Sequence, residues 1–518
     1  MANPLTVPPL GHSPDELQAR FERLQARLVP LWRSIERFTP DEQTIVVVPS
    51  ITVDFELRAS AAQAYEERFL FMLLLLRQPR ARMIYVTSQT IQPHVIDYYL
   101  GLLPGVIPSH ARDRLRLVAP NDGGPQPLTV KLLQRPRLLE HIRGLIRDPE
   151  RAHLAPFNTT IHERDLALRL GIPMYGADPQ HIGFGTKTGC RRLFRETDVA
   201  HPAGVEDVRT ESDLVEALLE LRAEHPDIEQ VMVKHNEGVS GDGNAVIDLR
   251  GFSGRPSRDE IRARMHAMQL EAKDSTTEQY LDKLARKGGI VEQRIVADEL
   301  FSPSVQLRIT PLGEVQLLST HDQLLGGPSG QTYQGCLFPA SESYAPMISR
   351  EALKVGRRLA IEGVLGRFAL DFLVARTAHG YAPYAIEINL RKGGTTHPFL
   401  TLQFLTDGNY DAETARFTSA RGAQKHFVAS DCVSSPRYRV FQSDDLFDIA
   451  VRRGLHYDHA RETGVVFHMM TALGDLGRTG LTAVDNSRAA AQALYQRTVS
   501  VLDEEAREAA APRPLPEV

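Results

Sequence analysis

The chain has 518 residues, 42% hydrophobic and 24% charged, which are the proportions of an ordinary globular protein of about three or four domains. Its 60 Lys and Arg residues and 65 Asp and Glu residues give a net charge of −5, without the basic excess of most nucleic-acid-binding domains. The three cysteines form neither a disulfide framework nor a zinc-binding spacing. The start of the chain lacks the apolar segment of a signal peptide, and the longest apolar run, Phe69–Leu76, is too short to span a bilayer. We therefore expect a cytoplasmic protein that binds neither nucleic acid nor membrane.

A helical leader is predicted over residues 1–40. Apolar residues recur at roughly helical spacing over Pro14–Phe38, and Pro30 is expected to kink or break the helix. No pattern of chemically active residues occurs here, so the leader is interpreted as scaffold.

Strand and helix patterns then alternate. The runs Thr44–Val48 and Met83–Val86 have the β-branched and aromatic composition of buried strands, and the apolar run Phe69–Leu76 predicts a buried helix between them. Because the alternation continues beyond these elements, we expect a parallel-sheet α/β domain over residues 41–178.

The segment Tyr384–Phe399, YAIEINLRKGGTTHPF, carries the strongest chemical signal. Period-2 alternation along a strand places Glu387, Asn389 and Arg391 on one face. A carboxylate beside an amide offers oxygen donors suited to a hard divalent cation. The preceding strand-like run carries one acid, Asp371, so two neighbouring strands could form a two-cation site for phosphates. The alternative is a buried ion pair between an acid and an arginine.

Two lysines and a Gly-rich turn form a second signal. Lys234 ends a short strand, and the turn after it contains Gly241 and Gly243, where backbone N–H groups could approach phosphate oxygens. Lys187, in GFGTKTG before a predicted helix, could also reach a phosphate, or it could be a solvated lysine. The turn is not a Walker A loop, because GxxxxGK[ST] is absent.

A third, weaker signal is the short strand VEQRI with an acid shortly after it. Its residues are Val291, Glu292, Gln293, Arg294 and Ile295. The backbone of such a strand could read an adenine edge, and Glu299 could accept ribose hydroxyls.

In this order the pieces resemble the ATP-grasp superfamily, in which two lobes grip ATP between them. The resemblance covers about residues 178–405, and the E-x-N-x-R strand is its sharpest feature. By matching position, it implies that Lys187 and Lys234 hold phosphates, with Lys234 also among the catalytic groups. It further implies that the segment 292–295 and Glu299 contact adenine and ribose.

The resemblance also implies a set of metal ligands and an arginine at the reacting centre. The implied Mg²⁺ ligands are Asp371, Glu387 and Asn389. An arginine that some ligases carry two residues before the first metal carboxylate is absent, since Ala369 stands there. The oxyanion role is therefore open among three arginines: Arg391, Arg308 and Arg367.

Over its whole length the chain is similar to one branch of the superfamily, the carboxylate–amine ligases related to the peptide ligase of pheganomycin biosynthesis. This similarity rests on the preceding α/β domain, on EINLRKGGTTHPF and on the tail GVVFHMMTALGDLGRTGLTAVDNS. The implied fold class is α/β, with a parallel-sheet pre-ATP-grasp domain before a two-lobed ATP-grasp core. The core is expected over residues 179–425, with a lid at about 230–295, and a small α+β C-terminal domain with its tail over 426–518.

The implied reaction has two steps and uses ATP and Mg²⁺. The γ-phosphate goes to a substrate carboxylate, and an amine then attacks the acyl phosphate to form an amide or peptide bond. The expected substrates are small carboxylates and amines, such as an amino acid or small peptide. Kinase-type or thioester-forming chemistry and a non-catalytic ATP sensor are the alternatives. Arg478, in GRTG, could bind an acidic substrate group or belong to a turn. The oligomeric state is open, with a homodimer as the candidate.

Overall fold

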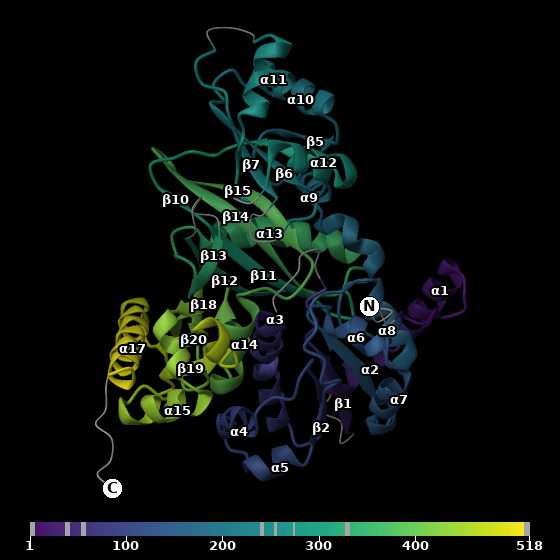
Figure 1. Cartoon of the computed structure of the whole chain (residues 1–518), viewed down its shortest axis with the longest axis vertical. Coiled ribbons are helices and arrows are strands. Elements are labelled where there is room, and N and C mark those ends of the chain that lie inside the picture. Colours follow the sequence, from purple (N-terminus) through teal and green to yellow (C-terminus); the bar gives the residue numbers. More distant parts are fainter. Residues whose placement is uncertain are drawn as a thin grey trace.

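The computed structural model describes residues 6–36, 42–52, 59–238, 243–252, 256–272, 275–326 and 332–511. Figure 1 shows a large sheet in the middle of the molecule, with a five-stranded sheet and its helices at the top. The N-terminal elements lie at the lower right, and the C-terminal strands lie at the lower left with α17 (Arg488–Ala509). Among the helices of the described ranges, none combines the length and the apolar character needed to cross a membrane.

The N-terminal region contains a four-stranded parallel sheet in the order β3-β2-β1-β4. Its strands are β1 (Gln43–Val48), β2 (Ala81–Val86), β3 (Leu115–Val118) and β4 (Ala152–Pro156). Val46 and Val47 are fully buried in two different apolar cores, so both faces of β1 are covered. The predicted parallel sheet is confirmed. Its helices are α3 (Ala59–Glu67), α4 (Pro93–Gly101), α5 (Pro108–Arg112), α6 (Leu128–Leu133), α7 (Pro136–Leu145), η2 (Pro149–Arg151) and α8 (Ile161–Leu170).

Two N-terminal elements differ from the sequence prediction. The leader forms α1 (Pro14–Gln25) and α2 (Leu28–Glu36), so the break precedes Pro30. Pro30 lies in the first turn of α2, where its missing N–H would have no helical partner. The apolar run forms a 3-10 helix, η1 (Arg68–Arg77), whose side chains are buried nearly all round because it has no polar face.

The five-stranded antiparallel sheet has the order β5-β9-β6-β7-β8. Its strands are β5 (Gly204–Val208), β6 (Gln230–His235), β7 (Asn244–Asp248), β8 (Gln269–Leu270) and β9 (Gly289–Gln293). One face packs in an apolar core with α10 (Glu211–Glu224), α11 (Arg258–His266) and α12 (Thr277–Lys287). Alternation along β6 places Val231 and Val233 in this core, while Met232 and Lys234 line the pocket on the other face.

The nine-stranded sheet carries the other side of the pocket. Eight strands follow the order β10-β14-β11-β12-β13-β18-β20-β19, and β15 pairs with β14 off this path. They are β10 (Leu300–Phe301), β11 (Pro303–Ile309), β12 (Val315–Gly326), β13 (Thr332–Phe338), β14 (Gly366–Thr377), β15 (Gly380–Asn389), β18 (His426–Ser434), β19 (Gly464–His468) and β20 (Arg478–Asp485). The predicted border between residues 425 and 426 precedes β18, yet β18 pairs directly with β13. The sheet therefore runs across that border, and the division of the chain there stays a prediction.

The remaining elements surround this sheet. They are η3 (Pro179–Gly185), α9 (Lys187–Glu196), α13 (Ala345–Ile361), α14 (Thr396–Thr406), β16 (Asn409–Asp411), β17 (Arg416–Thr418), η4 (Pro436–Val440), α15 (Ser443–Arg452) and α16 (Ala472–Leu476). One continuous apolar core joins the sheet to the N-terminal region, including Val47 of β1 and Phe372 of β14. This shared core places N-terminal side chains beside the pocket.

Candidate active site

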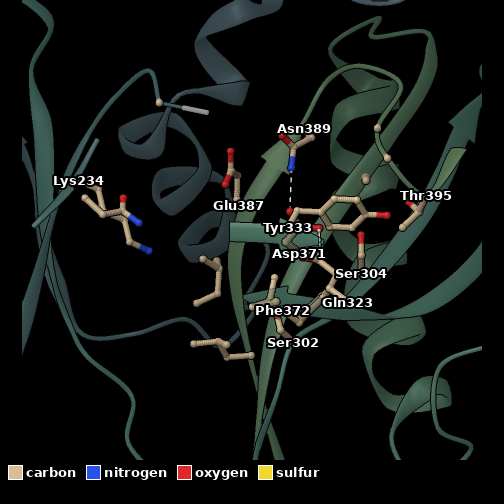
Figure 2. A pocket seen from close by; sticks show the side chains of 18 of the residues that line it. Lys234, Ser302, Ser304, Gln323, Tyr333, Asp371, Phe372, Glu387, Asn389 and Thr395 are labelled. Carbon is tan, nitrogen blue, oxygen red and sulfur yellow. Dashed lines mark hydrogen bonds between the residues drawn. The ribbon is translucent and has the colours of Figure 1, made fainter. Parts of the chain in front are cut away.

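Two carboxylates lie opposite each other on neighbouring antiparallel strands. Asp371 on β14 pairs in register with Glu387 on β15, and Asn389 follows two residues after Glu387. Because side chains alternate along a strand, these three share one face, while Ile388 between them is buried in the apolar core. The structure thus brings the three predicted metal-binding side chains to one place, as Figure 2 shows.

Both oxygens of Asp371 accept hydrogen bonds from amide groups. Gln323 Nε2 donates to Oδ1 and Asn389 Nδ2 donates to Oδ2, each at 2.9 Å (Figure 2). Burial, followed by the negative charge of Glu387, raises the pKa of Asp371 to about 6. Asp371 has no salt bridge within the described part of the chain, so a bound cation would relieve the cost of its charge. Gln323, on β12, was not predicted, because a lone glutamine has no sequence signature.

Lys187 pairs with the second carboxylate. Its Nζ lies 2.6 Å from Glu387 Oε2. Burial alone would lower the pKa of Lys187 and raise that of Glu387, but their mutual attraction outweighs burial and shifts both pKa values the other way. The Thr186 hydroxyl caps the helix that Lys187 begins by accepting from the Gly189 N–H at 3.0 Å. A Cβ on Gly189 would lie 1.8 Å from the Gly183 carbonyl oxygen, so this turn requires glycine.

Lys234 reaches the pocket from the opposite lobe. Its Nζ lies 2.5 Å from Glu292 Oε1, and Arg191 Nη1 lies 3.2 Å from the other oxygen of Glu292. Glu292 is 2% exposed, so its carboxylate is fixed between two cations. It was predicted as part of the adenine-reading strand, but its side chain instead holds Lys234 in position.

The segment after β9 forms the edge of the pocket. Gln293 and Arg294 donate their backbone N–H groups to the carbonyl oxygens of Ala203 and Gln230, at 2.7 and 3.0 Å. These two N–H groups are therefore already occupied. An adenine ring at this edge could still bond to backbone carbonyl groups and to the Ile295 N–H. Gln293, Arg294 and Ile295 all line the pocket.

One pocket of about 600 Å³ collects most of the predicted site residues. Those that line it are Lys187, Lys234, Gly243, Glu292, Gln293, Arg294, Ile295, Asp371, Glu387, Asn389 and Arg391. Gly241 lies outside the described residues. Arg391 was predicted on the same strand as Glu387, but β15 ends at Asn389 and the Arg391 N–H donates to the Asn389 carbonyl oxygen at 2.8 Å. A turn, not the strand, brings Arg391 to the pocket.

Three residues singled out by the sequence lie outside the pocket lining. Glu299 is about half exposed and forms a salt bridge with Arg376 at 3.1 Å. Arg308 lies over the ring of Trp32, with its guanidinium carbon 5.2 Å from the ring centre. Arg367, which faces Arg308 across β11 and β14, is also outside the lining, and burial lowers its pKa to about 10. Roles for Glu299 and Arg308 stay predictions from the sequence.

The far end of the pocket was largely missed by sequence reasoning. Its lining includes Tyr65, Arg68, Phe157, Asp431 and Arg478. Of these, only Arg478 stood out in the sequence, as one reading of GRTG. The others lie far apart along the chain in segments without a motif, so only the folded structure brings them together.

Comparison with known proteins agrees with this architecture. A family model described as IQCH-like ATP-grasp matches residues 180–277 and 260–413, and one described as PGM1 C-terminal domain matches residues 445–498. A curated L-propargylglycine–L-glutamate ligase from Streptantibioticus cattleyicolor is 28% identical over 449 residues, covering 84% of this chain and 88% of that protein. IQ motif-containing protein H from Danio rerio is 23% identical over 558 residues, covering 96% of this chain but 52% of that protein. The chain thus spans about half the length of this second relative.

Solved structures share the fold. A biotin carboxylase–β-γ-ATP complex from Campylobacter jejuni has a TM-score of 0.53 at 12% identity, covering 91% of this chain and 95% of that chain. An ADP complex of N5-carboxyaminoimidazole ribonucleotide synthetase has a TM-score of 0.50 at 12% identity, covering 90% of this chain and 98% of that chain. The family match thus assigns an ATP-grasp domain to residues 180–413, and these solved structures share the fold over most of the chain.

Proposed function

We propose that this protein is an ATP-dependent ligase that activates a substrate carboxylate as an acyl phosphate and joins it to an amine, forming an amide bond. The observation that carries this proposal is the single pocket in which two lysine–glutamate pairs, one from each lobe, flank the Asp371–Asn389 face. The relative from Streptantibioticus cattleyicolor is named for joining two amino acids, which supports amino acids or small peptides as substrates.

We assign phosphate binding to Lys187 and Lys234. Lys187 and Lys234 enter the pocket from different lobes, so a polyphosphate between them would meet positive charge on two sides. Their salt bridges to Glu387 and Glu292 hold the ammonium groups in place before the nucleotide arrives. Each ammonium has three N–H donors, so one bond to a carboxylate leaves others for phosphate oxygens.

The donor set on β14 and β15 fits Mg²⁺. Asp371 and Glu387 offer carboxylate oxygens, and Asn389 keeps its carbonyl oxygen available because its amide nitrogen is bonded to Asp371. When bound, Mg²⁺ supplies charge neutralisation for phosphate oxygens and orients them for transfer. Gln323 fixes the direction of the Asp371 carboxylate through its hydrogen bond.

Arg391 is placed to stabilise the reacting carboxylate. Its charge interacts with both Glu387 and Asp371, and its guanidinium carbon lies 5.8 Å from the Phe157 ring centre. It therefore lies at the border between the acidic face and the far end of the pocket. A fixed guanidinium there would stabilise developing negative charge without reorganising during the reaction. Among the three arginines left open by the sequence, we assign this role to Arg391.

The test is hydroxamate formation with MgATP, hydroxylamine and pooled amino acids and small carboxylates. Hydroxylamine intercepts an acyl phosphate without needing the natural amine, so a hydroxamate establishes carboxylate activation and splitting the pool names the carboxylate. ADP release without hydroxamate would instead indicate kinase-type transfer. A cytoplasmic location and a homodimeric state stay predictions from the sequence.

A further inference from the structure

The far end of the pocket carries more positive than negative charge. Arg68, Arg391 and Arg478 line it, and Asp431 is the carboxylate between them. Arg68 forms a salt bridge with the Asp431 side chain, whereas Arg478 donates from Nε to the Asp431 backbone carbonyl oxygen and from Nη2 to the Tyr65 hydroxyl at 3.4 Å. Within the described residues neither Arg391 nor Arg478 has a salt bridge to a carboxylate. Arg68 is buried and the other two arginines are partly buried, so a ligand of opposite sign would lower the cost of holding their charges together.

Two aromatic rings order these arginines into a row. The guanidinium carbons of Arg391 and Arg68 each lie 5.8 Å from the ring centre of Phe157. Arg68 and Arg478 likewise share the ring of Tyr65, at 4.8 and 5.9 Å. Since Arg391 borders the metal-binding face, Arg478 is the arginine at the far end of this row.

Asp431 orients this row of arginines, but its one negative charge cannot neutralise their three positive charges. One oxygen of Asp431 is bonded to Arg68, and the other lies 2.8 Å from His468 Nε2, which in turn lies 3.1 Å from His397 Nε2. All four side chains are at least nine-tenths buried. Both oxygens of Asp431 are thus engaged, while Arg68 Nε is buried without a hydrogen-bond partner in the described part of the chain. Fixed guanidinium donors with unused N–H groups are suited to bind a carboxylate.

We propose that Arg68 and Arg478 bind the carboxylate of the amine substrate, which makes that substrate an α-amino acid. This inference rests on the proposed ligase function. The acyl phosphate forms beside Arg391 and the metal-binding face, so the amine must approach from the side away from the nucleotide. In an α-amino acid one carbon separates the amine from its carboxylate, which places the carboxylate just beyond Arg391, where Arg68 and Arg478 lie.

The experiment compares two acceptors for the same activated carboxylate. With MgATP and a carboxylate identified by the hydroxamate assay, kcat/KM is measured for hydroxylamine, for each common L-amino acid including L-glutamate, and for their α-carboxamides. The wild-type enzyme should favour a free amino acid over its carboxamide by about 100-fold. Arg478→Gln should lower the ratio of amide to hydroxamate formation about 30-fold and remove most of this preference, and Arg478→Lys should retain part of it.

The matched control is Arg461→Gln, because Arg461 is an arginine of the same C-terminal region whose side chain is 82% exposed. It should leave both ratios within about twofold. An equal loss of amide and hydroxamate formation in Arg478→Gln would overturn the inference, as would a wild-type enzyme that accepts carboxamides as readily as acids. Hydroxamate without amide from any amino acid contradicts this inference alone, whereas absence of both hydroxamate and ADP contradicts the ligase function itself. Circular dichroism of each variant checks the fold, so an equal loss of both products counts against the inference when the variant keeps the wild-type spectrum, and Arg478→Lys provides a second variant for the same comparison.

Discussion

The two ends of the pocket are charged oppositely and are built differently. At one end, Asp371 and Glu387 come from strands that follow each other in the chain and meet in register across one hairpin. At the other end, Arg68, Arg391 and Arg478 come from the N-terminal region, the ATP-grasp domain and the last strand of the large sheet. The end assigned to ATP chemistry is thus encoded locally, whereas the end assigned to the substrate depends on the assembly of the whole chain.

The largest effect is expected from a substitution at the acidic end of the pocket, which holds Asp371 and Glu387. Glu387→Gln should lower ADP formation at least about 1,000-fold, because it removes a metal-binding oxygen and the counter-ion of Lys187 together. The measurement is ADP release under saturating MgATP, with circular dichroism to check the fold. Glu342→Gln is the control, since Glu342 is exposed and pairs with Arg416 at 3.1 Å. Unchanged ADP release in Glu387→Gln would disprove the metal assignment.

The next effect concerns the residue between the two ends. Arg391→Gln should lower kcat for hydroxamate formation about 100-fold, because the guanidinium is assigned to the reacting carboxylate. The same substitution at Arg308, over Trp32 and outside the pocket lining, should cost less than about threefold. A larger loss from Arg308→Gln than from Arg391→Gln would transfer the oxyanion role to Arg308.

A lower pH should weaken cation binding at the acidic end of the pocket, because Asp371 becomes protonated. Its pKa is raised to about 6, so the carboxylate gains a proton below that pH and competes less well for a cation. The KM for Mg²⁺ should therefore rise as pH falls from 7 to 5, by up to about tenfold per unit below the pKa, and excess Mg²⁺ should restore the rate. A KM for Mg²⁺ that is constant over this range would contradict the prediction.

The smallest expected effect is on the free energy of unfolding. Replacing Asp371 should stabilise the folded protein although it removes activity. Because the folded protein raises the pKa of Asp371 above its ordinary value, the protonated form favours folding at low pH, and this contribution is lost as pH rises through about 6. Asp371→Asn should therefore increase the free energy of unfolding of the ligand-free protein by about 1–2 kcal/mol at pH 8, while abolishing activity. Urea unfolding at pH 8 and pH 4.5 is the measurement, and the gain should shrink at the lower pH.

The sequence predicts local features better than long-range ones. Period-2 alternation was enough to place Glu387 and Asn389 on one face, and short apolar runs were enough for the parallel sheet. The same rule wrongly extended the strand to Arg391, because strand ends depend on turn geometry that alternation does not report. Gln323 and Arg68 could not be predicted, because Gln323 acquires its role from Asp371 on another strand and Arg68 from Asp431, which lies 363 residues later in the chain.

The predicted domain border illustrates a related limit. The similarity to carboxylate–amine ligases implied a separate C-terminal domain from residue 426, and hydrogen bonds between β13 and β18 carry the sheet across this border, so the division there stays a prediction. Similarity of sequence suggests where a domain begins, whereas strand pairing depends on edges that the rest of the fold leaves open.

The pairing of β13 with β18 and of β18 with β20 also constrains how the protein is made. Synthesis proceeds from the N-terminus, so the ribosome completes both lysines and the two acids assigned to metal binding before β20 emerges. Until β18 emerges, β13 presents an open backbone edge, and until β20 emerges, β18 presents one in its place; either edge can pair with another nascent chain. The end of the pocket assigned to ATP chemistry is thus translated first, but the sheet behind it is completed only by β20. Truncated chains should therefore aggregate rather than accumulate as partly active enzyme.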